Sequence, residues 1–322
     1  MPVRNGELFL ELAVASIVAQ SMPDWELIAI DDGSKDATMA ILQRLSAADA
    51  RIMALSSVGT GIVAALNQGI AASRAALIAR MDADDIAMPD RLERQIELMS
   101  ARPDLVAAGS AALTIDSAGN ETGSLAAPTE AASISAEMQR RNPFIHPTMM
   151  MRNTALLAVG GYRTGCTYAE DYDLWLRMEE RGALTNLAEP TLLFRVHTGQ
   201  TSQTKRLAQR AATALARQAA LRRRSGRSEG ANLDNSLHEC CAEYLAMRVS
   251  EPVEIGSNEA KDISVMLRFV HLQLPRHTVA LMLKRLGGEA KDAHVWLLRT
   301  RLAWARICNT LSGLKVLQGG KA

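Results

Sequence analysis

The stretch Ala76-Leu77-Ile78-Ala79-Arg80-Met81-Asp82-Ala83-Asp84-Asp85 decides the fold prediction for this chain. A short apolar run, long enough for one buried strand, ends in three carboxylates within four residues. Carboxylates this close together repel one another unless a cation or a proton lies between them. The pattern therefore predicts a hard divalent metal at the end of a strand and, with the metal, a ligand that carries phosphate.

Alternating strands and helices are expected on both sides of this stretch. Strands are predicted over residues 25–30, 51–55, 76–81 and 105–112, and helices over 8–20, 36–45, 62–72 and 91–100. This alternation is typical of βαβ units, and it predicts an α/β fold with a mainly parallel sheet flanked by helices. Ligands bind such sheets beyond the carboxyl ends of the strands, where Asp31-Asp32 and the 82–85 cluster are both expected.

After Pro143 the regular alternation of predicted strands and helices gives way to a less regular pattern. A helix with acids in its first turn is predicted from Ala169, with Leu174 and Trp175 facing inward, and two short strands are predicted over 184–188 and 191–196. Residues 204–229 read as a helix and a polar linker, and 230–322 as a helical C-terminal region. Within that region the basic amphipathic segment 295–317 is suited either to a membrane surface or to packing on the preceding helices.

The bulk composition narrows the class of protein. The 322 residues suggest about two domains, and 48% hydrophobic with 22% charged residues predicts a packed core rather than disorder. A net charge of +1 gives no global bias toward nucleic acid. The four cysteines, Cys166, Cys240, Cys241 and Cys308, lack paired spacing, which predicts buried, reduced thiols. We therefore expect a cytoplasmic protein, which could also bind peripherally to the inner face of the membrane.

Three acidic motifs are candidates for chemistry, and each has a plainer structural interpretation. Asp82 and Asp84 are suited to Mg²⁺ or Mn²⁺; the alternative is a solvated acidic turn or a helix cap. Asp32 could accept a hydrogen bond from a base or ribose; the alternative is an ordinary turn. The pair Glu170-Asp171 could supply a general base; the alternative is a pair of helix N-terminal acids stabilised by the helix dipole.

Two histidines and a basic cluster also have open interpretations. His197 is a candidate third metal ligand; the alternative is a structural histidine near a strand end. His146 could contact substrate; the alternative is a histidine in a loop without a functional role. The arginines of 222–227 could bind phosphate or anionic lipid; the alternative is a solvated linker.

In this order, the motifs resemble those of family 2 glycosyltransferases with the GT-A (nucleotide-diphospho-sugar transferase) fold, over residues 1–203. Met1-Pro2-Val3-Arg4-Asn5 resembles the first nucleotide loop of the family, and Asp31-Asp32-Gly33-Ser34 resembles the second, in which Asp32 would read the base. Gly59-x-Gly61 through Leu66-Asn67-Gln68-Gly69-Ile70 resembles the glycine-asparagine helix that flanks the donor in the family. Asp82-Ala83-Asp84-Asp85 resembles the metal motif, with Asp84 as its principal ligand.

The acceptor half resembles the family as well. His146-Pro147, Gly160-Gly161-Tyr162 and Glu170-Asp171-Tyr172-Asp173-Leu174-Trp175 match it, with Asp171 in the place of the catalytic base beside Glu170. Arg195-Val196-His197 and Gln200-Thr201-Ser202 resemble a segment that closes over the diphosphate. The resemblance implies nucleotide-sugar contacts from Pro2, Arg4, Asn5, Asp32, Gly61, Asn67 and Asp82, metal contacts from Asp84, Asp82 and His197, and acceptor contacts from His146, Gly161, Tyr162 and Trp175.

The reaction implied by the resemblance is inverting glycosyl transfer from a nucleotide-diphosphate sugar, with a UDP-sugar expected, to a saccharide or lipid-linked hydroxyl acceptor. Mn²⁺ or Mg²⁺ is the implied cofactor, and synthesis of cell-surface polysaccharide or glycolipid is the implied setting. The alternatives are a nucleotidyltransferase of related fold and a non-catalytic nucleotide-sugar-binding protein.

Two departures from the family pattern shape the structural expectation. The family has an apolar strand of about five residues just before the position of Pro2, which this chain does not contain, so the domain is expected to be N-terminally truncated and to leave neighbouring strands unpaired along an inner edge. Arg4 stands where the family often has an aromatic residue, and its guanidinium could also stack on a base.

Overall fold

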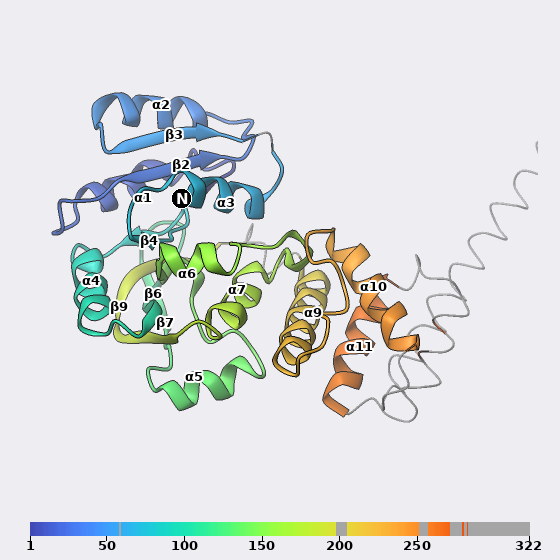
Figure 1. Ribbon diagram of the computed structural model, residues 1–322. Helices are drawn as coiled ribbons and strands as arrows, with labels where there is room; N and C mark the ends of the chain where they lie inside the picture. The colour runs from blue at the N-terminus through green and yellow to red at the C-terminus, as the bar shows by residue number, and fades with distance from the viewer. Residues whose placement is uncertain (58, 198–204, 251–256, 271–278, 280–281, 283–322) are drawn as a thin grey trace, which may run out of the picture. The chain divides into compact units, whose positions relative to one another are not determined.

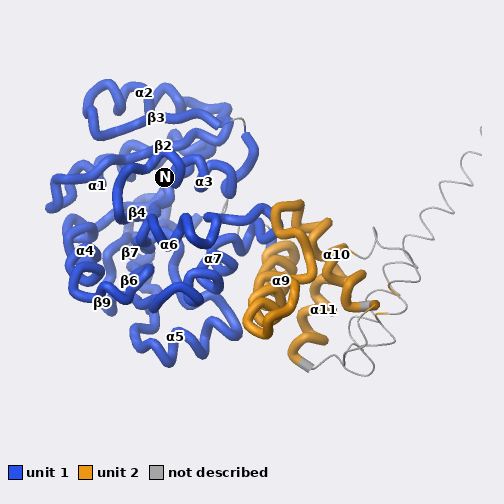
Figure 2. The backbone as a smooth tube through the Cα atoms, in the orientation of Figure 1, with its two compact units in different colours: residues 1–206 blue, residues 207–322 orange. Residues whose placement is uncertain are grey.

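The computed structural model describes residues 1–57, 59–197, 205–250, 257–270, 279 and 282. The chain divides into two compact units, residues 1–206 and 207–322 (Figure 2). The segment 200–202, the amphipathic segment 295–317 and Cys308 lie outside the described residues. Within the part of the chain that is described, no helix combines the length and the hydropathy needed to cross a bilayer.

The first sheet of unit 1 is parallel throughout. Its order is β1 (Pro2–Val3), β2 (Leu27–Asp31) and β3 (Ile52–Ser56). The helices α1 (Leu10–Val18), α2 (Thr38–Ala48) and α3 (Ile62–Ala72) accompany it, with α2 packed on β3 and α3 on β2 (Figure 1). Every residue of β2 is buried, which explains its unbroken apolar run before Asp31.

The second sheet is mixed. Its order is β4 (Leu77–Ala79), β8 (Met150–Arg152), β6 (Leu105–Ile115), β9 (Ala183–Arg195) and β5 (Ile86–Ala87), and β7 (Glu121–Leu125) pairs with β6. Among the described pairings of this sheet only that between β6 and β9 is parallel. The α/β expectation is confirmed, whereas the expected mainly parallel sheet is met only in β1 to β3.

The strand β9 corrects the prediction of two short strands. It runs unbroken over Ala183–Arg195, but its register against β6 shifts, so that Ser110 faces Leu187 and the next residue, Ala111, faces Pro190. Ala188 and Glu189, beside the expected break, therefore lie in a bulge within one strand.

The two sheets are not joined at the N-terminal end of the domain. β2 and β4 belong to separate sheets, and a cavity of about 330 Å³ is lined by residues that include Leu27 and Ile28 of β2 and Leu77 and Ile78 of β4. Met1 also lines this cavity, and its amine donates a hydrogen bond to the Ile28 carbonyl oxygen at 2.9 Å. In the described part of the chain, β1 and β4 are therefore edge strands of their two sheets.

The remaining helices of unit 1 are α4 (Arg91–Ala101), α5 (Ala131–Met138), α6 (Asn153–Ala158) and α7 (Glu170–Met178), with 3₁₀ turns at His146–Thr148 and Thr164–Cys166. Except for the Thr164–Cys166 turn, each of these elements directly precedes or follows a strand of the second sheet. On α7, Leu174 and Trp175 are both fully buried, as predicted from their place in the apolar pattern.

Unit 2 contains the helices α9 (Arg206–Arg224), α10 (Leu237–Ser250) and α11 (Ser257–Val270). Its interior includes buried Asp262, whose carboxylate accepts hydrogen bonds from Arg217 and from Gln218. Cys240 and Cys241 are buried here, and Cys166 is buried in unit 1, which confirms the expected burial for these three thiols.

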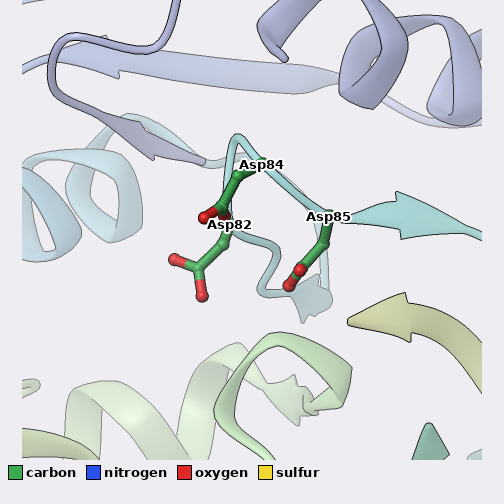
Figure 3. Close-up of side chains that lie close together, drawn as sticks. All are labelled: Asp82, Asp84 and Asp85. Atoms are coloured by element: carbon green, nitrogen blue, oxygen red, sulfur yellow. The ribbon is translucent and has the colours of Figure 1, made fainter. Parts of the chain in front are cut away.

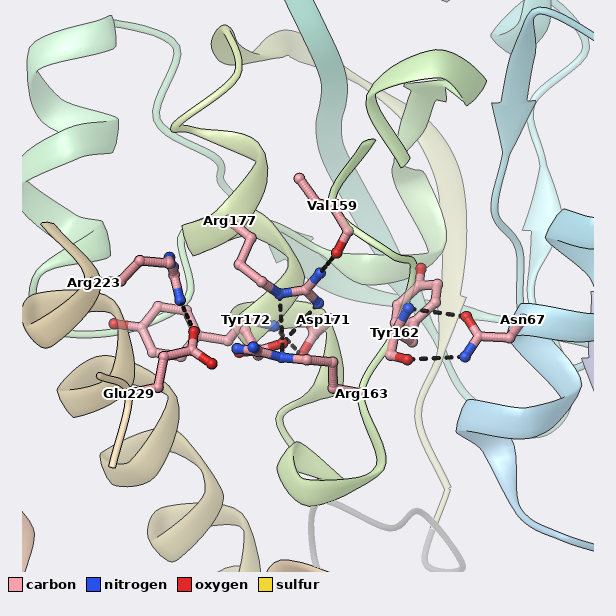
Figure 4. Close-up of polar contacts among 10 residues, drawn as sticks. Asn67, Val159, Tyr162, Arg163, Asp171, Tyr172, Arg177, Arg223 and Glu229 are labelled. Carbon is pink, nitrogen blue, oxygen red and sulfur yellow. Dashed lines mark hydrogen bonds and ion pairs between the residues drawn. The ribbon is translucent and has the colours of Figure 1, made fainter. Parts of the chain in front are cut away.

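The expected polar linker begins later than predicted. Arg222, Arg223 and Arg224 form the last turn of α9, and Arg222 is buried, with its Nε donating to the Ser228 carbonyl oxygen at 2.5 Å. Arg223 forms an ion pair with Glu229 (Figure 4). The prediction of a solvated cluster is therefore wrong at Arg222, because alanines on the same helix face carry it into the core of the unit.

Candidate active site

The nucleotide-binding candidates gather where β2 ends. The Asp32 carboxylate is buried and accepts hydrogen bonds from the Gly61 backbone N–H at 3.0 Å and from the Ser57 hydroxyl at 2.7 Å. The Arg4 guanidinium lies 3.8 Å from the same carboxylate. Gly61 has φ +98°, a conformation that L side chains rarely adopt, which accounts for a glycine at this contact.

The first loop is tied to the second loop by Asn5. The Asn5 backbone N–H donates to the Ser34 hydroxyl at 2.8 Å, and its side-chain oxygen accepts from the Lys35 N–H at 2.9 Å. Pro2 lies beside Ile30 in the parallel pairing of β1 with β2. The structure therefore brings Pro2, Arg4, Asn5, Asp32 and Gly61 together at one end of the first sheet.

The acidic cluster lies on the turn between β4 and β5. Asp82, Asp84 and Asp85 each offer a carboxylate oxygen, and these atoms lie within 4.8 Å of one another (Figure 3). The turn is held by Arg195 at the end of β9, whose backbone N–H donates to Asp85 and whose Nε donates to the Asp84 carbonyl oxygen. Asp85 belonged to the quoted motif but was not predicted as a ligand.

The electrostatics of this cluster fit a divalent cation. Burial, and then the neighbouring charge of Asp82, raise the pKa of Asp84, and burial with the charges of both neighbours raises the pKa of Asp85 well above its usual range. The Asp85 Oδ2 atom is buried and has no hydrogen-bond partner in the described structure. An unpartnered carboxylate oxygen among mutually repelling carboxylates is the donor set that a hard cation would complete.

The other predicted metal residues differ in their surroundings. His197 Nε2 lies 3.0 Å from Asp84 Oδ2, so the histidine adjoins the cluster. Asp82 is paired with the buried Arg80, Nη1 to Oδ2 at 2.5 Å, so its charge is already balanced. A cation bound here would therefore draw chiefly on Asp84 and Asp85 for compensating charge.

The candidate base lies in the first turn of α7. Asp171 Oδ1 accepts from the Tyr172 backbone N–H at 2.7 Å, and Asp171 Oδ2 accepts from the Asn142 side-chain amide at 2.6 Å. Although Asp171 lies deep in the domain, its residue keeps partial access to solvent. Burial raises the pKa of Asp171 above its usual range.

Glu170, the neighbour of Asp171, is more fully enclosed. Its carboxylate accepts from the Tyr168 N–H at 2.7 Å, where Tyr168 has φ +80°. Burial, and then the charge of Asp171, raise the pKa of Glu170 to about 7. A carboxyl group with this pKa exchanges its proton near neutral pH, which suits acid–base chemistry.

The predicted acceptor-side residues are held in a polar and aromatic cluster. His146 Nε2 lies 2.8 Å from the Tyr162 hydroxyl, and burial with the charge of Arg80 lowers the pKa of His146 well below its usual range. Trp175 packs edge-on against the His146 ring at 5.9 Å and is fully buried. This burial corrects the expected acceptor contact of Trp175, because the indole supports the cluster from the core.

Asn67 binds the backbone of the acceptor half. Its side chain accepts from the Tyr162 N–H and donates to the Tyr162 carbonyl oxygen, both at 2.9 Å (Figure 4). At Gly161, with φ +67°, an added Cβ would lie 2.6 Å from the Asn67 side-chain oxygen. The helix α3 therefore joins the two halves of the domain through an amide whose oxygen and nitrogen are both engaged.

Arg80 is a central residue that the sequence analysis did not select. It is buried at 5% exposure, and its charge acts on Asp82, on the Glu170-Asp171 pair and on His146. The signal available in the sequence was a lone cation inside an apolar strand, just before the carboxylates. One buried guanidinium thus contacts Asp82 of the 82–85 turn and exerts its charge on the two acids of α7.

Comparison with known proteins agrees with this geometry. The model of the family described as Glycosyl transferase family 2 matches residues 1–160. The chain is 32% identical over 186 residues to the putative glycosyltransferase EpsE of Bacillus subtilis (strain 168), covering 56% of this chain and 66% of that protein. It is 31% identical over 207 residues to the O-antigen biosynthesis glycosyltransferase WbnJ of Escherichia coli, covering 63% of this chain and 80% of that protein.

A solved structure shares the fold. The crystal structure of S. aureus TarS residues 1–349 in complex with UDP-GlcNAc superposes with a TM-score of 0.55 at 14% identity, covering 94% of this chain and 90% of that chain. At this identity the likeness establishes the GT-A fold alone.

Proposed function

Because the chain belongs to glycosyl transferase family 2, we propose that it transfers a sugar from a nucleotide-diphosphate sugar, specifically a UDP-sugar, to a hydroxyl group of a saccharide or lipid-linked acceptor. Nucleotide-sugar binding in the solved TarS complex and the O-antigen assignment of WbnJ support this choice of donor and of acceptor class. The proposed setting is the synthesis of cell-surface polysaccharide or glycolipid by a cytoplasmic protein, with lipid-linked acceptors at the inner membrane face.

The observation that carries the proposal is the buried Arg80, whose guanidinium is 2.5 Å from Asp82 of the metal motif. Its charge also reaches the Glu170-Asp171 pair, where it partly offsets the rise in pKa that burial causes. A carboxylate able to accept a proton therefore lies in the same electrostatic environment as the cluster suited to a cation and a diphosphate. Sugar transfer needs both of these groups at one site.

In the proposed reaction Asp171 acts as the general base. The acceptor oxygen forms a bond to the anomeric carbon as the bond from that carbon to the diphosphate breaks, and the acceptor proton passes to the Asp171 carboxylate. Attack from the face opposite the diphosphate inverts the anomeric configuration. The bonding electron pair leaves with the nucleoside diphosphate, whose base would be read by Asp32.

Asp84, Asp82 and His197 are the residues proposed to hold Mn²⁺ or Mg²⁺, and Asp85, which offers an oxygen within 4.8 Å of those of Asp82 and Asp84, would supply with Asp84 most of the uncompensated negative charge. A bound divalent cation supplies charge stabilisation to the departing diphosphate. The nucleotide loops orient the donor through Arg4, Asn5 and Asp32. Glu170 shares the environment of Asp171 and influences the proton affinity of the base.

The test uses the 322-residue chain and two readouts. UDP binding is measured by calorimetry with Mn²⁺ and after chelation, and UDP release is measured from a panel of UDP-sugars with saccharide and lipid acceptors. We expect Asp84→Asn to weaken Mn²⁺-dependent UDP binding, and Asp171→Asn to preserve UDP binding while lowering release about 100-fold or more. Asp104→Asn, at an exposed surface pair with Arg102, is the control and is expected to change neither readout.

Two results would contradict the proposal. If UDP binds equally well without a divalent cation, the assignment of the acidic cluster is wrong. If Asp171→Asn transfers sugar at the wild-type rate, another group acts as the base. UDP binding without release from any donor would instead favour the non-catalytic nucleotide-sugar-binding alternative.

A further inference from the structure

Asn142 makes a short contact with the candidate base from a separate part of the chain. It lies in the connection between α5 and the 3₁₀ turn at His146–Thr148, whereas Asp171 lies in α7. The Asn142 Nδ2 atom donates a hydrogen bond to Asp171 Oδ2 at 2.6 Å. An amide donor at this distance from an ionisable carboxylate makes a charge-assisted hydrogen bond.

The orientation of the Asn142 amide is determined by a second contact. Its Oδ1 atom lies 3.0 Å from the Phe144 backbone nitrogen. A backbone N–H can only donate, so the amide oxygen must face Phe144, and the NH₂ group must therefore face Asp171. The geometry therefore makes the Asn142 NH₂ group the donor toward the base.

The short segment that carries Asn142 is anchored in the core. Pro143 follows it and restricts the backbone, and Phe144 is buried and packs edge-on against Trp175 at 5.9 Å. Trp175 lies one turn after Asp171 on α7. The segment and the helix therefore share one buried aromatic contact, which limits movement of the amide relative to the carboxylate.

The Asp171 carboxylate is consequently held at both oxygens. Oδ1 accepts from the Tyr172 N–H of its own helix, and Oδ2 accepts from Asn142. Each carboxylate oxygen has two acceptor sites, so one site on each remains for other donors. Two hydrogen bonds from different elements define the plane of the carboxylate and leave acceptor capacity for an incoming hydroxyl.

We propose that Asn142 is a positioning residue for Asp171, whose amide holds the carboxylate in the orientation that receives the acceptor proton. This inference rests on the proposed function, because it requires Asp171 to act as the base. Asn142 itself touches the base and needs no contact with the sugar.

The same hydrogen bond should affect the protonation of the base. The charged or titratable groups whose fields reach Asp171 include Glu170, Arg80 and Tyr162. Burial raises the pKa of Asp171, whereas the Arg80 charge and the Asn142 amide lower it. Removing the amide therefore favours the protonated, inactive form of the base at a higher pH than in the wild type.

The experiment compares Asn142→Ala and Asn142→Asp with the wild type in the UDP-release assay. We expect kcat to fall about 10- to 100-fold in Asn142→Ala, as for a lost hydrogen bond to a charged group. The midpoint of the acidic limb of the kcat–pH profile should move to higher pH, and the KM for the UDP-sugar should change little. Asn142→Asp should shift the acidic limb at least as far, because the two carboxyl groups would share a proton.

Asn186→Ala is the matched control. Like Asn142, Asn186 has an Nδ2 that donates a hydrogen bond, here to the Pro128 carbonyl oxygen at 2.8 Å; Asn186 is buried, whereas Asn142 is half-buried, and its strand supplies no proposed base. This variant should lose stability without a shift of the acidic limb. UDP binding, measured on every variant, confirms that the nucleotide site is folded.

The outcomes separate the two proposals. If Asp171→Asn abolishes transfer but Asn142→Ala retains the wild-type kcat and acidic limb, the positioning role is wrong and the base assignment stands. If Asn142→Ala lowers only the melting temperature, as Asn186→Ala is expected to do, the residue is structural and the inference is overturned. If Asp171→Asn has wild-type activity, the proposed base fails independently of Asn142.

Discussion

Replacing Asp173 tests whether α7 is held by a buried ion-pair network. The Asp173 carboxylate is 1% exposed and accepts hydrogen bonds from Arg163 Nε at 3.0 Å and from Arg177 Nε and Nη2 at 2.9 and 2.7 Å. Arg177 also donates to the Val159 carbonyl oxygen, and Figure 4 shows the two guanidinium groups close together. Asp173 lies two residues after the proposed base in the first turn of α7. The network therefore anchors the turn that carries Asp171.

The magnitude follows from burial. Asp173→Asn would leave the buried Arg177 and the largely enclosed Arg163 guanidinium groups facing a neutral amide. Breaking a buried ion pair from one side costs about 3–5 kcal/mol. Asp104→Asn removes a carboxylate with a similar two-point contact to Arg102, but both side chains of that pair are more than half exposed. An exposed pair contributes about 0–1 kcal/mol. The difference between the two variants isolates the effect of burial at comparable geometry.

The assay is urea unfolding at several pH values, followed by tryptophan fluorescence and by circular dichroism. Burial alone would raise the pKa of Asp173, but the charges of Arg177 and Arg163 outweigh it and hold the pKa below its usual range. The stabilisation is therefore present above the unfolded-state pKa and is lost as the pH falls through the folded-state pKa. The gap between wild type and Asp173→Asn should be widest near neutral pH and should narrow in acid. A loss no larger than that of Asp104→Asn would refute the reasoning.

Two further predictions concern the same half of the domain. Because burial raises the pKa of Glu170 to about 7, its ionised form opposes folding above the unfolded-state value, so Glu170→Gln should stabilise the protein by about 3 kcal/mol at pH 8 and by little near pH 4.5 in urea titrations. An equal effect at both pH values would contradict the shift. Gly161→Ala should cost about 1–3 kcal/mol, because the new methyl group would meet the Asn67 side-chain oxygen at 2.6 Å from a positive φ. Gly160→Ala is the control for backbone strain alone, because Gly160 has φ +76° and an added Cβ would meet no heavy atom within 4 Å. Thermal unfolding of the two variants should therefore separate the cost of the clash with Asn67 from the cost of backbone strain.

Local patterns were predicted well where they reflect contacts between residues close in the chain. The helix predicted over 62–72 is α3, with Ile62–Ala72 as its bounds, because its apolar residues recur on one face and Gly61 precedes it. The strand that ends before Asp82 was also predicted, although it is shorter than expected at Leu77–Ala79. These features depend on period and on turn residues, which a single sequence displays.

Pairing between distant segments could not be predicted in the same way. An apolar strand such as β8 reads alike whether its neighbour is parallel or antiparallel, and the bulge in β9 appears only against the register of β6. The short strands β5 and β7 were not predicted, since two to five residues carry little periodicity. The prediction of a mainly parallel sheet failed in the second sheet for this reason.

The sequence by itself determined which carboxylates could serve in the site, because Asp32, Asp84 and Asp171 belong to local motifs whose spacing is visible in one dimension. Tertiary structure alone decided how those carboxylates are held and charged. The charge of buried Arg80 on the Glu170-Asp171 pair, the amide of Asn142 on Asp171 and the packing of Trp175 against His146 all join residues that are distant in the chain. Burial and hydrogen bonding set the proton affinity of a carboxyl group, and both arise only when distant segments pack together.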